Sequence, residues 1–310
     1  MADRALTTTP RALTTTPQPP GPAGADMAAP LRENPGAAYA LGNSPAERDR
    51  LRQQAAELRA DSEALLDRVG IAAGSSAIDL GCGPEGILDL LAGRAGPAGR
   101  VTGLDFNPAS VAQARRFAAK RGYRNVQVVQ GDARGTGLPS GSFDLVHTRT
   151  LLVNASDPEA VLTEMVRLAR PGGAIAVLEP DAGMSVCYPP HQAWDRMARI
   201  WADVTRAYGI DAQIGRRLPD LFRQAGLADI GIEARADIYP HGHSRRTVRP
   251  DLLRSMHSQI LAKGICDERE LHEVDRAVRE HLDDPATLVM PNLLFLAWGR
   301  KQASSQQVRA

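Results

Sequence analysis

The sequence contains few cysteines, few aromatic residues and no excess of charge of either sign. Its three cysteines, Cys82, Cys187 and Cys266, lie far apart and lack the spacing of a metal site, so we expect no metal and a reduced, cytoplasmic setting. A net charge of +1 with scattered arginine pairs gives no clustered basic face, which argues against a nucleic-acid partner. No apolar run approaches the roughly 20 residues of a membrane-spanning helix, so no membrane span is expected.

The two ends of the chain differ in composition from the rest. Residues 4–10 read Arg-Ala-Leu-Thr-Thr-Thr-Pro and are repeated at once as residues 11–17, before a Pro-, Gly- and Ala-rich stretch that runs to Pro35. This segment has too little apolar surface to offset its ordering entropy, so residues 1–35 are predicted to be a disordered tail. A transit peptide is the alternative, but prolines would break the amphipathic helix that it needs. The polar residues 301–310 are predicted to form a second, loose tail.

The central part of the chain alternates between strand and helix patterns. Five short apolar segments lie at residues 77–80, 101–105, 126–130, 143–146 and 174–178. Such alternation predicts a parallel sheet covered by helices on both faces, with ligands at the carboxyl ends of the strands. A further helix is expected ahead of the first strand, with Ser44 as its N-cap and Pro45 at its first position.

A glycine-rich turn follows the first of these strands. Gly81 and Gly83 can turn tightly and approach a ligand, and together with Gly86 they match the G-x-G-x-x-G pattern of dinucleotide folds. Asp79 separates two readings of this turn, because a carboxylate there would repel an anionic pyrophosphate. S-adenosylmethionine carries an ammonium and a sulfonium and has no phosphate, so an acid at this place suits it better.

Further acids and polar residues end the next strands. Asp105 can accept both hydroxyls of a ribose, and Phe106 follows where it can cover an adenine face. After the third strand come Asp132, which can accept from the adenine amino group, and Ala133. The fourth strand is followed by a loop that adds two cofactor candidates to this set, Thr148 and Arg149.

The residues from Asp79 to Glu179 resemble the class I S-adenosylmethionine-dependent methyltransferases, in particular the small-molecule branch similar to bacterial ubiquinone and sterol-type C-methyltransferases. The order of elements extends the resemblance to residues 36–300. It implies a Rossmann-like, seven-stranded, mostly parallel sheet with helices on both faces, in which residues 230–238 and 293–298 supply the last two strands. It also implies that S-adenosylmethionine is the cofactor, that Gly81 and Gly83 wrap its methionine part, and that Asp105 binds its ribose. Glu85 departs from the family, which often has a further glycine there.

The resemblance also implies a helical cap over the substrate. An insertion at residues 182–215 carries a stripe that includes Trp194 and Met197, which either packs internally or faces an apolar acceptor. A second helical segment is expected at residues 250–281. Tyr39 is a candidate lid residue, and His147 and His191 are candidate general bases by location.

The main functional hypothesis is methyl transfer to an apolar small molecule such as a secondary metabolite, on carbon, oxygen or nitrogen. Two alternatives stay open, a nicotinamide-dependent oxidoreductase and a scaffold that binds the cofactor without turnover. The sequence is compatible with a homo-oligomer and does not identify the acceptor.

Overall fold

The computed structural model describes residues 45–303. These residues belong to one compact unit, which starts at residue 36. Tyr39 and Ser44 lie outside the described residues, as do the predicted N-terminal tail and residues 304–310.

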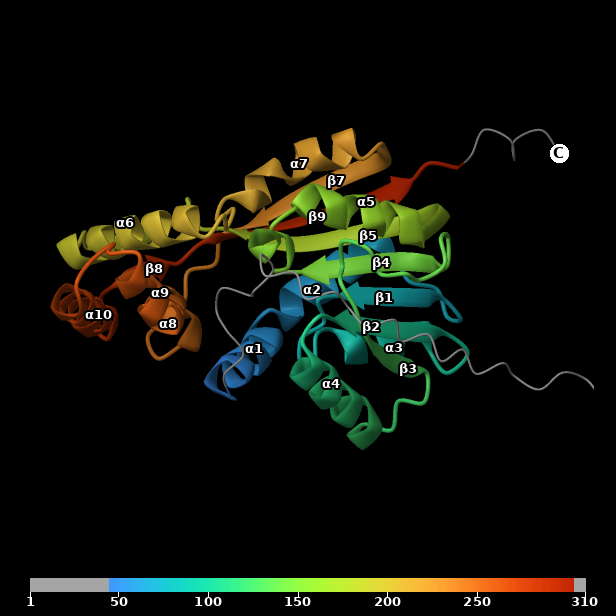
Figure 1. Ribbon diagram of the computed structural model, residues 1–310, viewed down its shortest axis with the longest axis horizontal. Helices are drawn as coiled ribbons and strands as arrows, with labels where there is room; N and C mark the ends of the chain where they lie inside the picture. The colour runs from blue at the N-terminus through green and yellow to red at the C-terminus, as the bar shows by residue number, and fades with distance from the viewer. Residues whose placement is uncertain (1–44, 304–310) are drawn as a thin grey trace, which may run out of the picture. The chain divides into compact units, whose positions relative to one another are not determined.

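One seven-stranded sheet organises the described domain (Figure 1). Its strand order is β3-β2-β1-β4-β5-β9-β7, and the first five strands of that order pair in parallel. Strand β9 is antiparallel to both of its neighbours. The predicted Rossmann-like, mostly parallel sheet is therefore confirmed. The strands of this sheet are β1 (Ser76–Leu80), β2 (Arg100–Asp105), β3 (Val126–Gln130), β4 (Phe143–Arg149), β5 (Ala169–Asp181), β7 (Leu227–Arg235) and β9 (Leu293–Lys301).

Helices cover both faces of the sheet, as predicted. On one face, side chains of α2 and α3 such as Leu65 and Leu88 join Val101 of the sheet in one buried cluster. On the other face, Met165 of α5 and Phe222 of α7 pack against sheet residues such as Ile78. These two buried clusters hold the sheet between the helix layers. They thereby position the ends of its strands, where the candidate site lies. The helices are α1 (Pro45–Glu57), α2 (Arg59–Val69), α3 (Leu88–Ala95), α4 (Pro108–Lys120), the 3-10 turn η1 (Leu152–Asn154), α5 (Pro158–Leu168) and α7 (Ile214–Gln224).

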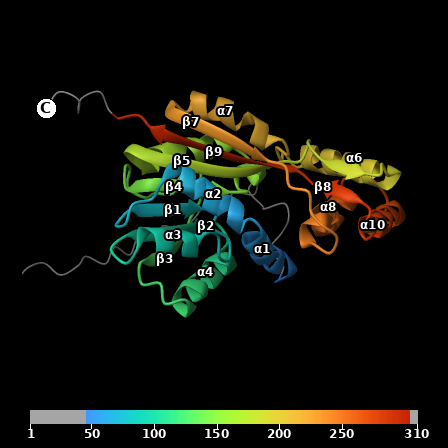
Figure 2. The same cartoon turned by 180° about the vertical axis from the view of Figure 1, so that it is seen from behind.

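A helical cap lies beyond the carboxyl ends of the parallel strands, as two opposite views of the ribbon show (Figure 1; Figure 2). Its core joins Trp194 and Ile200 to Met256 and Val278, so the two segments that the sequence presents separately pack into one body. No described helix is long and apolar enough to cross a membrane. The cap consists of β6 (Val186–Tyr188), α6 (Gln192–Ala207), η2 (Ser244–Thr247), α8 (Val248–Ser255), α9 (His257–Ala262), α10 (Glu268–Leu282) and β8 (Leu288–Met290).

Several predicted boundaries differ from the structure. Residues 147–149 are not a loop, because β4 continues in register with β1 as far as the pair Leu80 and Thr148. Helix α7 already begins at Ile214, inside the predicted cap insertion, and β7 begins three residues before the predicted strand. Lys301 closes β9, where it pairs with Leu227, so that strand runs one residue into the predicted loose tail.

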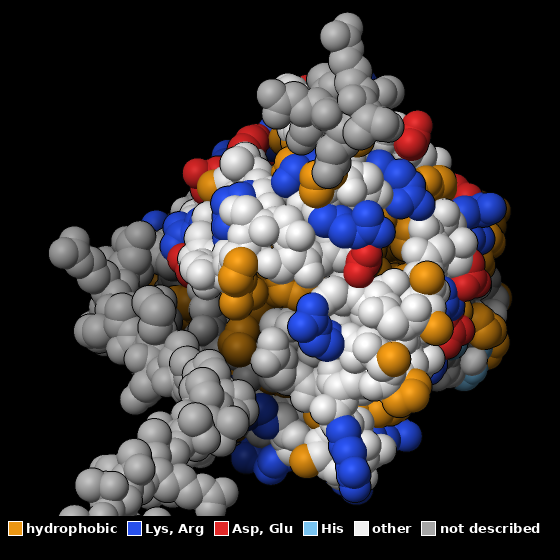
Figure 3. Space-filling view, turned by 90° about the vertical axis from the view of Figure 1, so that its right-hand side faces the viewer, with side chains coloured by type: hydrophobic (Ala, Val, Ile, Leu, Met, Phe, Trp, Pro, Cys, Tyr) orange, Lys and Arg blue, Asp and Glu red, His pale blue; other side chains and the backbone are white. Residues whose placement is uncertain are grey.

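The opposite end of the sheet, where the parallel strands begin, carries Lys and Arg side chains scattered among uncharged ones (Figure 3). Several arginines of the domain are paired with acids, including Arg170 with Asp144 and Arg94 with Asp67. The strand-end acids and the glycine turn singled out in the sequence lie at the other edge, toward the cap.

Candidate functional site

The glycine turn is tied to the end of β2. The N–H groups of Gly81 and Cys82 both donate to the carbonyl of Leu104, at 2.8 and 3.0 Å. The N–H of Gly83 donates to Oδ2 of Asp105 at 2.8 Å. Gly83 has a φ of 58°, and a Cβ added to it would meet no atom within 4 Å. The turn therefore leaves open space beside Gly83, which suits a ligand that approaches the backbone closely.

Asp105 reaches the turn from the end of β2 and keeps acceptor capacity. Its Oδ1 accepts the N–H of Asn107 at 2.8 Å, so donors within residues 45–303 use two of the roughly four lone-pair positions of the carboxylate. Burial raises the pKa of this carboxyl. The next residue, Phe106, is 53% exposed, an unusual position for a large apolar ring and one that suits a flat ligand. Both placements fit a nucleoside.

Asp79 is buried and engaged rather than lying open at the mouth of the turn. It is only 2% exposed, Oδ1 lies 2.7 Å from Nδ1 of His147, and Oδ2 accepts the N–H of Ile87 at 3.2 Å. A Cβ on Gly86 would lie 2.3 Å from Oδ2, so only glycine leaves room for this carboxylate. The third glycine of the motif therefore makes space for Asp79. His147, a candidate base, is fully buried, and its Nδ1 contacts Asp79.

Thr148 and Arg149, the two cofactor candidates after His147, make different contacts. Thr148 is buried, and its hydroxyl donates to the carbonyl of Leu80 at 2.9 Å, so the structure gives it a role inside the sheet. Arg149 donates to Oγ of Ser62 at 3.0 Å and to the carbonyl of Gly86 at 3.4 Å. Burial lowers the pKa of Arg149, while the charge of Asp79 acts in the opposite direction. Arg149 thus sets a cation beside the glycine turn.

The segment after β3 joins the same edge. The N–H of Gly131 donates to the carbonyl of Asp105 at 3.0 Å, which brings Asp132 and Ala133 next to the end of β2. Asp132 accepts from the guanidinium of Arg134, with Nη2 at 2.6 Å from Oδ2, and these hydrogen bonds lower the pKa of the carboxyl. An adenine amino group would therefore share this carboxylate with Arg134.

Glu179 is a residue of the site whose role the sequence reasoning missed. It is fully buried at the end of β5, and its carboxylate accepts the N–H groups of Leu151, Leu152 and Val153 at 2.9, 2.7 and 3.2 Å. It thereby holds the loop after β4, whose Leu151 side chain packs over Gly81. The only signal in the sequence is an acid directly after the apolar run Ala174–Leu178.

The protonation of Glu179 gives a pH-dependent contribution to stability. Burial raises the pKa of its carboxyl from 4.5 to about 8, although three backbone N–H groups donate to it. A pKa that is higher in the folded chain gives a stabilisation that is complete below pH 4.5 and is lost as the pH rises toward 8. We expect the unfolding free energy of the wild type to fall relative to Glu179→Gln by about 1.4 kcal/mol per pH unit across this range, the slope for one proton released on unfolding. Urea unfolding from pH 5 to 8 measures the difference, and parallel pH profiles would contradict it.

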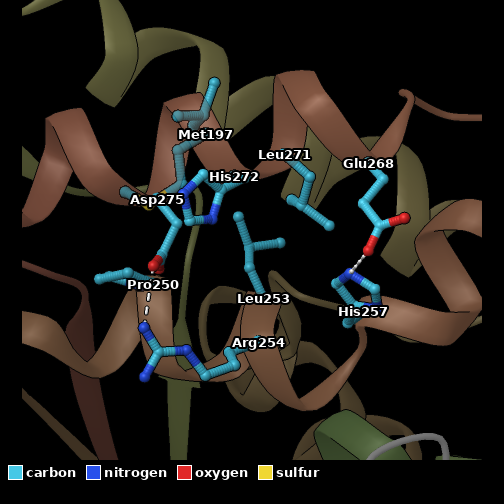
Figure 4. A pocket seen from close by; sticks show the side chains of 10 residues that line it. Met197, Pro250, Leu253, Arg254, His257, Glu268, Leu271, His272 and Asp275 are labelled. Atoms are coloured by element: carbon cyan, nitrogen blue, oxygen red, sulfur yellow. Dashed lines mark hydrogen bonds and ion pairs between the residues drawn. The ribbon is translucent and has the colours of Figure 1, made fainter.

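The apolar stripe of α6 belongs to the core of the cap. Trp194 and Met197 are 5% and 1% exposed and pack with α8 and α10, so this stripe is packing and does not present a free surface to an acceptor. A cavity of about 260 Å³ opens beside it between α8, α9 and α10 (Figure 4). Ion pairs join Arg254 to Asp275 and His257 to Glu268 around it. Residues of the sheet do not line this cavity.

His191, the second candidate base, is the N-cap of α6. Its Nδ1 accepts the N–H of Ala193 at 3.2 Å, and its ring stacks on His281 with centroids 4.5 Å apart. We expect His191→Ala to lower the free energy of unfolding by about 1 kcal/mol, and His191→Asn, which restores a strong N-cap, to lose much less. Urea unfolding of both variants measures this. Equal losses in the two variants would show that capping is not what His191 contributes.

The part of the chain that carries these residues is similar to known proteins. A protein-family profile described as a methyltransferase domain matches residues 71–225, half of the chain. A ubiquinone/menaquinone biosynthesis C-methyltransferase of Hahella chejuensis is 34% identical over 175 residues, which cover 52% of this chain and 70% of that protein. The chain belongs to the class I S-adenosylmethionine-dependent methyltransferases. Its cofactor is accordingly S-adenosylmethionine.

Two further comparisons show how much of its length this methyltransferase shares with similar proteins. An uncharacterized 37.1 kDa transposon protein of Streptomyces fradiae is 36% identical over 171 residues, 55% of this chain and 48% of that protein. The chain thus spans about half the length of this relative. The structure of phosphoethanolamine N-methyltransferase 2 of Haemonchus contortus with S-adenosyl-L-methionine superposes with a TM-score of 0.52 at 17% identity, over 78% of this chain and 52% of that chain. At this identity it shows a shared fold.

No cluster of three or more metal-ligating side chains occurs in residues 45–303. Of the predicted cofactor residues, the structure brings Gly81, Gly83, Asp105 and Arg149 to one place, with Phe106, Asp132 and Ala133 beside them. Asp79 lies beneath this group, and Thr148 faces the sheet interior.

Proposed function

We propose that this methyltransferase transfers the methyl group of S-adenosylmethionine to an apolar small-molecule acceptor, a secondary metabolite, on carbon, oxygen or nitrogen. The observation that carries the proposal is the bond between Gly83 N–H and Asp105, which sets a carboxylate with free lone pairs against an open glycine turn. Neither alternative, the oxidoreductase or the scaffold, finds comparable support.

Different cofactor residues bind the ribose, the adenine and the methionine part of the methyl donor. Asp105 accepts the ribose hydroxyls on the positions left by its two backbone donors. Phe106 covers a face of the adenine, and Asp132 and Ala133 border its edge. Gly81 and Gly83 wrap the methionine part. Arg149, which has no ion pair within residues 45–303, pairs with the carboxylate of that part.

The chain's own contribution to the reaction is positioning. When bound, S-adenosylmethionine supplies a methyl carbon that its sulfonium already activates. The two described histidines proposed as bases are engaged elsewhere, His147 with Asp79 and His191 at the start of α6. The described residues therefore act by holding the acceptor in line with the methyl group and by keeping water out, effects that account for large accelerations without a base.

Apolar side chains near the carboxyl ends of the strands support an apolar acceptor. Beyond the end of β5, Met184, Val186 and Tyr188 are 47%, 46% and 64% exposed, and Phe106 is exposed after β2. The name of the Hahella chejuensis relative refers to quinones, which are apolar acceptors of this kind. An apolar surface with few polar groups is typical of a small-molecule site.

Calorimetry with S-adenosylmethionine, S-adenosylhomocysteine and reduced nicotinamide adenine dinucleotide tests the proposal. We expect micromolar or tighter binding of the first two and no heat from the third. Tight binding of the nicotinamide without binding of S-adenosylmethionine would establish an oxidoreductase. Binding of S-adenosylmethionine without methylation of any phenolic, quinol or amine acceptor in a panel would favour a scaffold.

A further inference from the structure

The contact between His147 and Asp79 joins two buried polar side chains from neighbouring strands. The residues stand directly opposite each other in β4 and β1, and His147 is 0% exposed. Nδ1 of the imidazole lies 2.7 Å from Oδ1 of Asp79. Nε2 is buried and has no hydrogen-bond partner among residues 45–303. Nothing in the catalytic proposal above uses this histidine.

The hydrogen bonding around the ring favours one tautomer of His147. A doubly protonated imidazole would carry a second N–H at Nε2, and burying that donor without a partner is costly. The neutral ring with its proton on Nδ1 leaves no unpaired donor and donates to the carboxylate. Through this hydrogen bond His147 fixes the direction in which the carboxylate of Asp79 points.

The carboxylate of Asp79 is held from three sides. His147 donates to Oδ1, the N–H of Ile87 donates to Oδ2, and Gly86 leaves the space that Oδ2 occupies. The other charged and titratable groups around it are Arg149 from β4, Asp105 from β2 and Cys82 of the turn. These three contacts hold the carboxylate in one orientation. It lies directly beneath the glycine turn proposed to wrap the methionine part.

We propose that His147 is a positioning residue that orients Asp79 toward the ammonium group of the methyl donor. The inference rests on the proposed function, and it adds a specific part of the ligand to it. It separates recognition of the amino-acid end, which depends on His147, from recognition of the nucleoside end, which depends on Asp105. A histidine with a merely structural role would affect both ends alike.

Two ligands that differ in the amino-acid end test this separation. S-adenosylhomocysteine carries the ammonium and the carboxylate, whereas 5′-methylthioadenosine lacks both. We expect His147→Leu to weaken S-adenosylhomocysteine about 10- to 100-fold, the effect of a lost hydrogen bond to a charged group, and 5′-methylthioadenosine less than about threefold. His147→Asn places an N–H near the position of Nδ1 and should restore most of the affinity for S-adenosylhomocysteine. His272→Asn, at an exposed histidine of α10, is the matched control and should change neither.

Each outcome of these titrations has one meaning. If the wild type binds neither ligand, the proposed function fails. If the wild type binds both, but His147→Leu weakens both equally or neither, the role of His147 is overturned. Should His147→Leu not fold, nitrogen NMR of the wild-type histidines decides: a proton on Nδ1 alone at pH 7 supports the inference. Protonation at Nε2 would overturn it.

Discussion

Replacing Gly86 with alanine is expected to lower the free energy of unfolding by roughly 3 to 5 kcal/mol and to remove measurable cofactor binding. The new Cβ would lie 2.3 Å from Oδ2 of Asp79 and 2.7 Å from the carbonyl of Cys82. The backbone cannot move to relieve this, because Gly86 has a φ of 56° and lies in a turn tied to β2. Asp79 would have to leave its partners, and a buried carboxylate without them is strongly destabilising.

Two other glycines separate the clash from the strain of the backbone conformation. Gly83 and Gly122 also have positive φ, 58° and 73°, but a Cβ on either would meet no atom within 4 Å. Each alanine variant should therefore lose only about 1 to 2 kcal/mol of stability. Gly83→Ala should in addition lose cofactor affinity, because its Cβ would fill the space left for the ligand, whereas Gly122→Ala should bind normally. Urea unfolding and calorimetry give both quantities. Equal stability losses in all three variants would contradict the account of Gly86.

The second large effect is expected from Asp105→Ala. We expect this change to weaken binding of S-adenosylhomocysteine by about 1 to 3 kcal/mol, because it removes the acceptor of the ribose hydroxyls. It also leaves the N–H groups of Gly83 and Asn107 without their carboxylate, which loosens the glycine turn. Asp105→Asn keeps one acceptor oxygen and should lose less. Calorimetry with S-adenosylhomocysteine measures these differences.

The matched control for Asp105 is an acid near the start of another parallel strand of the same sheet. Asp144 of β4 accepts the N–H of Ser76, the first residue of β1, at 2.8 Å and pairs with Arg170. It therefore lies at the opposite end of the strands from the glycine turn. Asp144→Ala should lower stability without changing ligand affinity. Unchanged affinity in Asp105→Ala would mean that the ribose lies elsewhere, and a loss in both variants would point to general destabilisation.

The carboxyl-edge site was predictable from the sequence wherever the information is local. Gly81 and Gly83 follow an apolar strand directly, and Asp105 closes the next strand, so chain order and strand direction bring them to one edge. The cap after β5 was implied by the family resemblance and not by local pattern. Sequence reasoning misassigned residues 147–149 as a loop, because a buried His-Thr-Arg run lacks the apolar pattern by which strands are recognised.

What the sequence determined by itself was the doubly covered parallel sheet, the glycine turn and the family, since each depends on short-range periodicity and on residue types a few positions apart. The tertiary structure alone decided the partners. Asp79 and His147 are 68 residues apart, and Glu179 lies 26 to 28 residues from the N–H groups that it accepts. The cap likewise joins α6 to α10 across the whole of α7 and β7. Strand register and burial in a shared core determine which residues pair. Neither can be recognised from the local sequence, which therefore does not distinguish a buried, hydrogen-bonded side chain from an exposed, reactive one.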